Sequence, residues 1–128
     1  MIEKGRQEAT ARAHSFKYAF AGWQYVLRTQ HNTWIHGVIT IAVFALSLWL
    51  RLSFLEWSVL ILTIMIVWIA EFVNTAVEAV VDLAMPEAHP LAKVAKDVAA
   101  AAVLIGSVGS VAVGLLVLGP PLLARILG

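Results

Sequence analysis

The sequence has no cysteine and few charged residues. Without thiols, the chain can form neither disulfide bonds nor thiolate metal sites. Charged residues make up 13% of the chain, whereas soluble proteins have about 25%. The net charge is only +1, which argues against nucleic acid or another polyanion as a general partner. The polar first ten residues lack the apolar core of a secretory signal, so no cleaved signal is expected there.

Apolar residues are abundant instead. They make up 61% of the 128 residues, enough for one domain over residues 1–128, and the mean hydropathy is +0.86. Three segments, at about 35–50, 57–84 and 98–118, approach or exceed the roughly 20 apolar residues needed to cross a bilayer. We therefore predict an all-α membrane protein with three transmembrane helices. Gly106, Ser110 and Gly114 recur every four residues in the third segment, a spacing that favours close helix packing in lipid.

A fourth helix is predicted ahead of the first span, at about 9–28. Phe16, Phe20, Trp23 and Leu27 fall on one helical face, and basic residues fall among the polar positions. This pattern is typical of an amphipathic helix that lies on the membrane surface.

The basic residues predict an orientation, because cytoplasmic loops are rich in Lys and Arg. The N-terminal segment and the second loop share one side and hold Lys4, Arg6, Arg12, Lys17, Arg28, Lys93 and Lys96. The other side holds only Arg51 and Arg125. The N-terminus and the second loop are therefore expected in the cytoplasm, with the spans in a bacterial plasma membrane.

Polar residues that are unfavourable in lipid share one face of the second span. With about 100° per residue, Glu71, Asn74, Glu78 and Asp82 fall within a wedge of about 80°. A carboxylate in a membrane helix is unfavourable unless it faces a partner or water, so this face should point into the bundle or a wet cavity. Two carboxylates and an amide oxygen suit Mg²⁺, and a carboxylate in apolar surroundings can act as a general base. Interhelical hydrogen bonding is the structural alternative.

The loop after this face carries further polar residues. Pro86 is expected to end the second helix and Pro90 to lie in the first turn of the third. Lys96 and Asp97 follow at the start of the third span, where a lysine can hold a phosphate group. His89 is the weaker candidate, because loop histidines are usually only solvated.

Several motifs together resemble a known family. Residues 71–82 fill the pattern E-x-x-N-[ST]-x-[IV]-E-x-x-V-D, and PEAHPLAKVAKDVAAAAVLI follows at 86–105. SFKYAFAG at 15–22 and N-x-x-I-H at 32–36 extend the match. From about residue 12 to 118 the chain resembles the integral-membrane prokaryotic diacylglycerol kinases, a family that includes undecaprenol kinases.

The resemblance implies a homotrimer of three-span subunits that transfers the γ-phosphoryl group of Mg-ATP to a lipid alcohol at the cytoplasmic interface. By position, Glu71 resembles the catalytic base, Glu78 a metal ligand and Asn74 a supporting residue. The positions that resemble nucleotide contacts, besides Glu78, are Arg12, Tyr18, Glu87, His89, Lys96 and Asp97.

One position departs from the family pattern. Many members have a second metal-binding glutamate eight residues after the glycine that matches Gly22, and here that position is Gln30. Its neutral carbonyl oxygen should bind Mg²⁺ more weakly than a carboxylate does. The SFKYA, N-x-x-I-H and HPLAKVAKDVAA motifs resemble the members that favour undecaprenol, so we expect undecaprenol ahead of diacylglycerol.

Two other functions fit the residues alone. Glu71 and Glu78 can serve as a relay in a small proton- or ion-conducting bundle, which needs no Lys96 or Asp97. A purely structural membrane oligomer, held by the small residues of the third span, is the other alternative.

Overall fold

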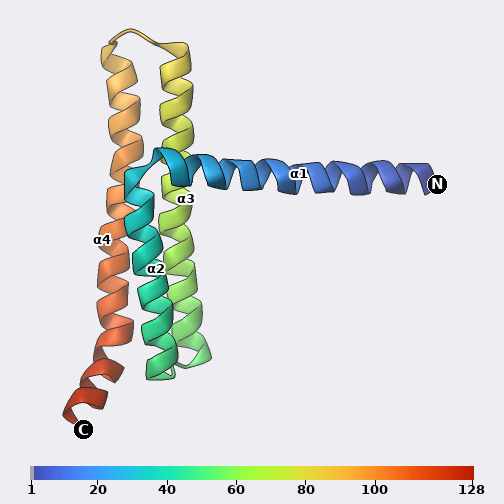
Figure 1. The fold of residues 1–128 in the computed structure, drawn as a ribbon. Helices are drawn as coiled ribbons and strands as arrows, with labels where there is room; N and C mark the ends of the chain where they lie inside the picture. Colours follow the sequence, from blue (N-terminus) through green and yellow to red (C-terminus); the bar gives the residue numbers. More distant parts are fainter. Residues whose placement is uncertain (1) are drawn as a thin grey trace. The chain divides into compact units, whose positions relative to one another are not determined.

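The structure, a computed structural model, describes the backbone of residues 2–128 and the side chains of residue 12 and residues 14–128. The described part forms four helices: α1 (Ile2–Thr29), α2 (His31–Leu50), α3 (Phe54–Ala84) and α4 (Pro90–Leu127) (Figure 1). The predicted all-α class is confirmed. Lys4 and Arg6, which entered the charge count, lie outside the described side chains.

The chain divides into two compact units, residues 1–34 and residues 35–128. The first unit consists of α1 and the beginning of α2. Phe16, Phe20 and Trp23 of α1 are exposed, and so are Arg12 and Tyr18. The helix that the sequence predicts is present, while its place on a membrane surface stays a prediction.

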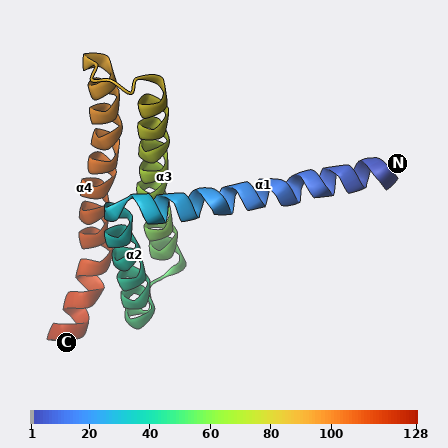
Figure 2. The same ribbon diagram turned by 45° about the horizontal axis from the view of Figure 1, so that its top comes forward.

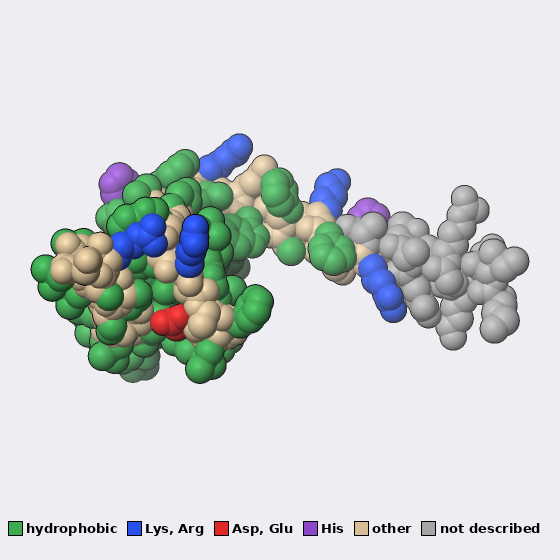
Figure 3. All heavy atoms as spheres, turned by 90° about the horizontal axis from the view of Figure 1, so that it is seen from below, with side chains coloured by type: hydrophobic (Ala, Val, Ile, Leu, Met, Phe, Trp, Pro, Cys, Tyr) green, Lys and Arg blue, Asp and Glu red, His purple; other side chains and the backbone are tan. Residues whose placement is uncertain are grey.

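The second unit is a bundle of α2, α3 and α4, which lie side by side in both ribbon views (Figures 1 and 2). Each helix is long and apolar enough to cross a membrane, so the three predicted spans are confirmed. No more than 28% of the most apolar window of any of them is buried. Most of the face drawn in Figure 3 is accordingly hydrophobic, a surface that suits lipid rather than water.

The turn between α2 and α3 is closed by two caps. Arg51 follows the last residue of α2 and lies in the left-handed region with φ 56, and the N–H of Leu52 bonds to the carbonyl of Ser47 at 3.3 Å. This is a Schellman motif, with arginine where glycine is usual. Ser53 and Glu56 then form a capping box, each bonding the other's backbone N–H, which begins α3.

The third span is longer than the sequence predicts, since α4 covers residues 90–127 rather than 98–118. At its start, Nδ1 of His89 accepts from the N–H of Leu91 at 3.2 Å, and Pro90 fits the first turn because its missing N–H needs no partner. At its end, Pro120 and Pro121 lie inside the helix. The last turns of α4 lean away from the helix axis, as expected where proline removes backbone hydrogen bonds (Figure 1).

The buried core of the bundle is small. Leu50, Leu60 and Leu118 pack together, one from each helix. Gly106 of α4 approaches α3, since a Cβ there would lie 3.9 Å from the Cα of Val67. Of the small residues in the third span, Gly106 therefore makes the close helix contact that the spacing predicts, whereas Gly114 faces open space.

Replacing Ser53 by alanine should lower the free energy of unfolding by about 1 kcal/mol, the usual effect of losing an N-cap oxygen. The side chain of Ser53 accepts from the N–H of Glu56 at 3.3 Å, and alanine leaves that donor without its partner. Unfolding in mixed detergent micelles, followed by circular dichroism, measures the change.

Ser58→Ala is the control, because the Ser58 hydroxyl bonds only to the carbonyl of Phe54 within the same helix. Equal losses in the two variants would contradict a capping role.

Candidate active site

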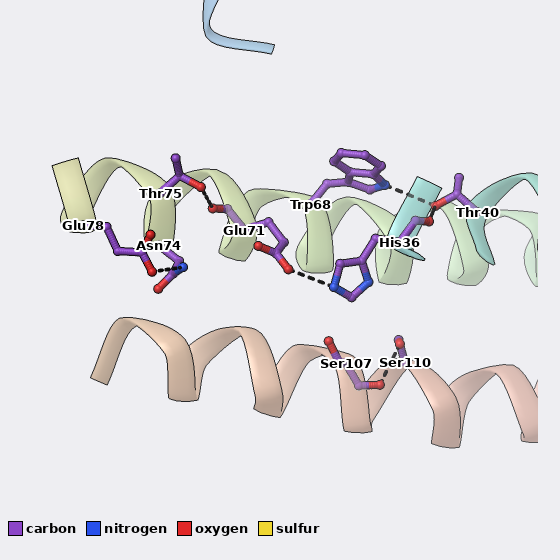
Figure 4. Close-up of polar contacts among 9 residues, drawn as sticks. All are labelled: His36, Thr40, Trp68, Glu71, Asn74, Thr75, Glu78, Ser107 and Ser110. Carbon is purple, nitrogen blue, oxygen red and sulfur yellow. Dashed lines mark hydrogen bonds and ion pairs between the residues drawn. The ribbon is translucent and has the colours of Figure 1, made fainter. Parts of the chain in front are cut away.

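Two polar contacts join α2 to α3 in the bundle interior. Nε2 of His36 lies 2.9 Å from Oε1 of Glu71, and Nε1 of Trp68 donates to Oγ1 of Thr40 at 3.2 Å. The Thr40 hydroxyl in turn donates to the carbonyl of His36 at 2.7 Å. Figure 4 shows these side chains reaching across between the two helices. The two contacts lie about one turn apart, which fixes the register of α2 against α3.

Glu71 is the most buried ionisable side chain among those described, with 2% of its surface exposed. The contact with His36 has an ion-pair distance, but its geometry falls short of a directed hydrogen bond. The backbone carbonyl of Glu71 accepts from the Thr75 hydroxyl at 2.9 Å. The carboxylate therefore sits in the bundle with one close polar neighbour, the imidazole of His36.

The polar face of α3 becomes more exposed from Glu71 towards the loop. Asn74 is 7% exposed, Glu78 is half-buried, and the side chain of Asp82 is 65% exposed. The first members thus point into the bundle, as the angular count predicts. The last member lies at the surface.

Asn74 and Glu78 form a pair one turn apart. Nδ2 of Asn74 donates to Oε1 of Glu78 at 3.1 Å, so Oδ1 of Asn74 points the other way (Figure 4). That oxygen is buried and has no hydrogen-bond partner. An unpartnered buried amide oxygen beside a carboxylate offers two hard oxygen donors, which fits Mg²⁺.

The pair does not by itself make a closed metal cage. Among the described residues, no group of three or more His, Asp or Glu side chains could hold a metal ion. This is compatible with Mg²⁺, which usually takes one or two carboxylates and completes its shell with water and substrate phosphates.

A hollow of about 640 Å³ lies at the loop between α3 and α4. The polar residues predicted around this loop lie together in its lining. They are Asp82, Glu87, His89, Lys93, Lys96 and Asp97. Nζ of Lys96 pairs with Asp82 across the two helices at 2.5 Å, and Nζ of Lys93 pairs with Asp97 along α4 at 2.5 Å. Lys96 and Asp97 are thus held by different partners rather than by each other.

A second cavity, of about 380 Å³, lies between α2, α3 and α4. Its lining is mainly aliphatic, with residues such as Val43, Leu60 and Leu118. The polar groups in the lining include His36, Ser107 and Ser110, and Ser110 donates to the carbonyl of Ser107 at 2.8 Å. The His36 side chain therefore borders this apolar cavity and also contacts Glu71.

Comparison with known proteins decides the family. The model of the prokaryotic diacylglycerol kinase family matches residues 17–118. The chain belongs to this family. Its expected reaction class, transfer of a phosphoryl group to an alcohol, is therefore confirmed at the level of a lipid kinase.

Relatives within the kinase family carry two names. A diacylglycerol kinase of Synechocystis is 46% identical over 111 residues, which are 86% of this chain and 63% of that protein. The undecaprenol kinase of Bacillus subtilis is 38% identical over 117 residues, 91% of this chain and 95% of that protein. A diacylglycerol kinase of Helicobacter pylori is 37% identical over 106 residues, 77% and 83% of the two chains. The chain thus spans less than two thirds of the Synechocystis protein.

Three of the predicted kinase site residues lie in the first unit. Arg12 and Tyr18 are exposed on α1, and the Tyr18 ring lies 6.2 Å from that of His14. Gln30 lies between α1 and α2 and is half-buried. Their roles at the nucleotide and the metal stay predictions.

His36 is a candidate site residue that sequence reasoning did not assign. It belongs to the N-x-x-I-H motif, which was used only to extend the family match. Spacing along one helix finds residues that share a face, whereas His36 and Glu71 lie on different helices. The signal that could have found it is an ionisable histidine inside a predicted membrane span, because such residues are unfavourable in lipid.

Proposed function

We propose that this chain transfers the γ-phosphoryl group of Mg-ATP to the hydroxyl of a membrane lipid at the cytoplasmic interface. The observation that carries the proposal is the polar face of α3. It runs from the buried Glu71, through Asn74 and Glu78, to the hollow at the loop. A lipid alcohol and a soluble nucleotide can meet along such a face, because one end lies among apolar helices and the other end is open.

In the proposed step, the lipid oxygen forms a bond to the γ-phosphorus while the bond to the β–γ bridging oxygen breaks. ADP leaves with that oxygen, and Glu71 takes the proton of the hydroxyl. Phosphoryl transfer depends mainly on positioning and on charge neutralisation, so one base and a few cationic groups are sufficient. The buried carboxylate suits the base, since it reaches the apolar side of the site.

The donor end uses the hollow at the loop. Lys96 supplies a positive charge for phosphate, with Asp82 holding its side chain. Glu87, His89 and Asp97 border the same hollow. Arg12 and Tyr18 of α1 are proposed as nucleotide contacts from their positions in the family pattern alone. Glu78, Oδ1 of Asn74 and Gln30 are the proposed protein ligands of Mg²⁺, which would neutralise phosphate charge when bound.

We propose undecaprenol as the preferred acceptor, with diacylglycerol second. The SFKYA, N-x-x-I-H and HPLAKVAKDVAA motifs support this preference, and the undecaprenol kinase of Bacillus subtilis is similar over 95% of its length. The apolar cavity beside His36 offers room for part of a hydrocarbon chain close to Glu71.

The proposed working form is a homotrimer in the bacterial plasma membrane with a cytoplasmic N-terminus. The excess of basic residues on the N-terminal side and in the second loop supports the orientation. The large exposed apolar area of the three spans is available to both lipid and neighbouring subunits.

Glu71→Gln should lower lipid phosphorylation by about 10²- to 10⁴-fold, the usual contribution of a general base. Nucleotide binding should persist, because the loop hollow does not include Glu71. The measurement uses protein reconstituted in vesicles with γ-labelled ATP, together with a nucleotide-binding titration.

Glu56→Gln is the matched control, since glutamine can replace glutamate in the capping box at the other end of α3. Full turnover by the Glu71→Gln protein would remove Glu71 from the role of base.

A competition assay tests the acceptor. With undecaprenol and diacylglycerol offered together to the wild-type protein in vesicles, most of the label should enter the polyprenol. Label mainly in diacylglycerol would reverse the preference. Proton flux with no labelled lipid would support the conducting bundle over the kinase.

Gln30→Glu should lower the Mg²⁺ concentration needed for half-maximal activity, because a carboxylate adds a charge to the ligand set. Gln24→Glu adds the same charge to the exposed surface of α1 and should leave the magnesium titration unchanged. A Gln30→Glu titration equal to wild type would show that this side chain is not a ligand.

A further inference from the structure

The Glu71 carboxylate has one close polar neighbour from another helix, the imidazole of His36. Nε2 and Oε1 lie 2.9 Å apart, and the two side chains are 17% and 3% exposed. No other charged side chain of α2, α3 or α4 is described in ion-pair contact with either of them. A polar contact shielded from water is stronger than the same contact at the surface. The orientation of the carboxylate therefore depends on His36.

His36 is itself held in place. The Thr40 hydroxyl donates to the His36 carbonyl at 2.7 Å, and Oγ1 of Thr40 accepts from Trp68 at 3.2 Å. Trp68 lies on α3, three residues before Glu71. The two helices are thus tied twice within about one turn, and this arrangement limits how far the imidazole can move relative to the carboxylate (Figure 4).

The imidazole also borders the apolar cavity between the three helices. The lining includes His36 but not Glu71, so a lipid hydroxyl in this cavity would approach the carboxylate past the imidazole. Of the two carboxylate oxygens, Oε1 is the one near Nε2, which leaves Oε2 for the incoming hydroxyl.

We propose that His36 is a positioning residue for the phosphoryl transfer. Its Nε2 lies 2.9 Å from Oε1 of Glu71 and holds that oxygen by a polar contact, which aims Oε2 at the acceptor hydroxyl. This role rests on the function proposed above. His36 acts through Glu71 and takes no proton from the lipid, so a neutral side chain with an N–H donor in the same place should suffice.

The test compares three variants with wild type in the reconstituted lipid-labelling assay. His36→Leu removes the donor and should lower kcat roughly 10- to 100-fold, the usual effect of misplacing a catalytic group. The KM for ATP should stay unchanged, because the hollow at the loop begins at Val81, about 15 Å further along α3 by helical rise. His36→Gln keeps an N–H donor and should restore most of the lost kcat. His31→Leu, at an exposed position on α2, is the control.

Two outcomes overturn the role of His36 while the kinase itself stands. One is wild-type kcat in His36→Leu. The other is an equal loss in His36→Gln and His36→Leu, which would mean that the imidazole must carry the proton. A wild-type protein that labels no lipid would instead refute the proposed function.

A second measurement tests the contact without any turnover. In protein labelled with ¹⁵N-histidine, the Nε2 resonance of His36 should shift in Glu71→Gln, while that of His31 should not. The His36 resonance is assigned by its loss in His36→Gln. An unshifted His36 resonance would refute the contact, whatever the enzyme assay shows.

Discussion

The structure depends on the burial of one carboxylate among apolar helices. A charged side chain at the centre of a membrane helix costs about 3 kcal/mol even by the lower measured scales, so Glu71 must face the bundle and must have a partner. His36 supplies that partner from α2 at 2.9 Å. The contact between Trp68 and Thr40 lies about one turn away and holds the same pair of helices. Asn74 and Glu78 lie on the same side of α3 as Glu71, so they are turned towards the bundle as well.

This arrangement separates two environments along a single helix. At Glu71 the side chain is buried, while at Asp82 the side chain is largely exposed. In between, Glu78 and the unpartnered oxygen of Asn74 offer hard donors. A kinase that joins a soluble nucleotide to a lipid requires such a gradient, since its two substrates dissolve in different phases.

Much of the fold follows from local patterns. The apolar lengths predicted three spans, Pro86 correctly ended α3, and Pro90 correctly began α4. Helix α4 nevertheless extends further at both ends than the predicted third span. Its start depends on the cap supplied by His89, and its last turns continue past Pro120 and Pro121. Proline signals a break in water more strongly than in a bundle, where neighbouring groups satisfy the freed backbone.

The sequence by itself determined the membrane class, the family and the single face that Glu71, Asn74, Glu78 and Asp82 share. These are properties of composition, of motif and of the 3.6-residue period within one helix. Only the tertiary structure decided that Lys96 pairs with Asp82 rather than with its neighbour Asp97, and that His36 meets Glu71. Both contacts join different helices, and their partners depend on how those helices pack. Helical periodicity holds no information about that packing.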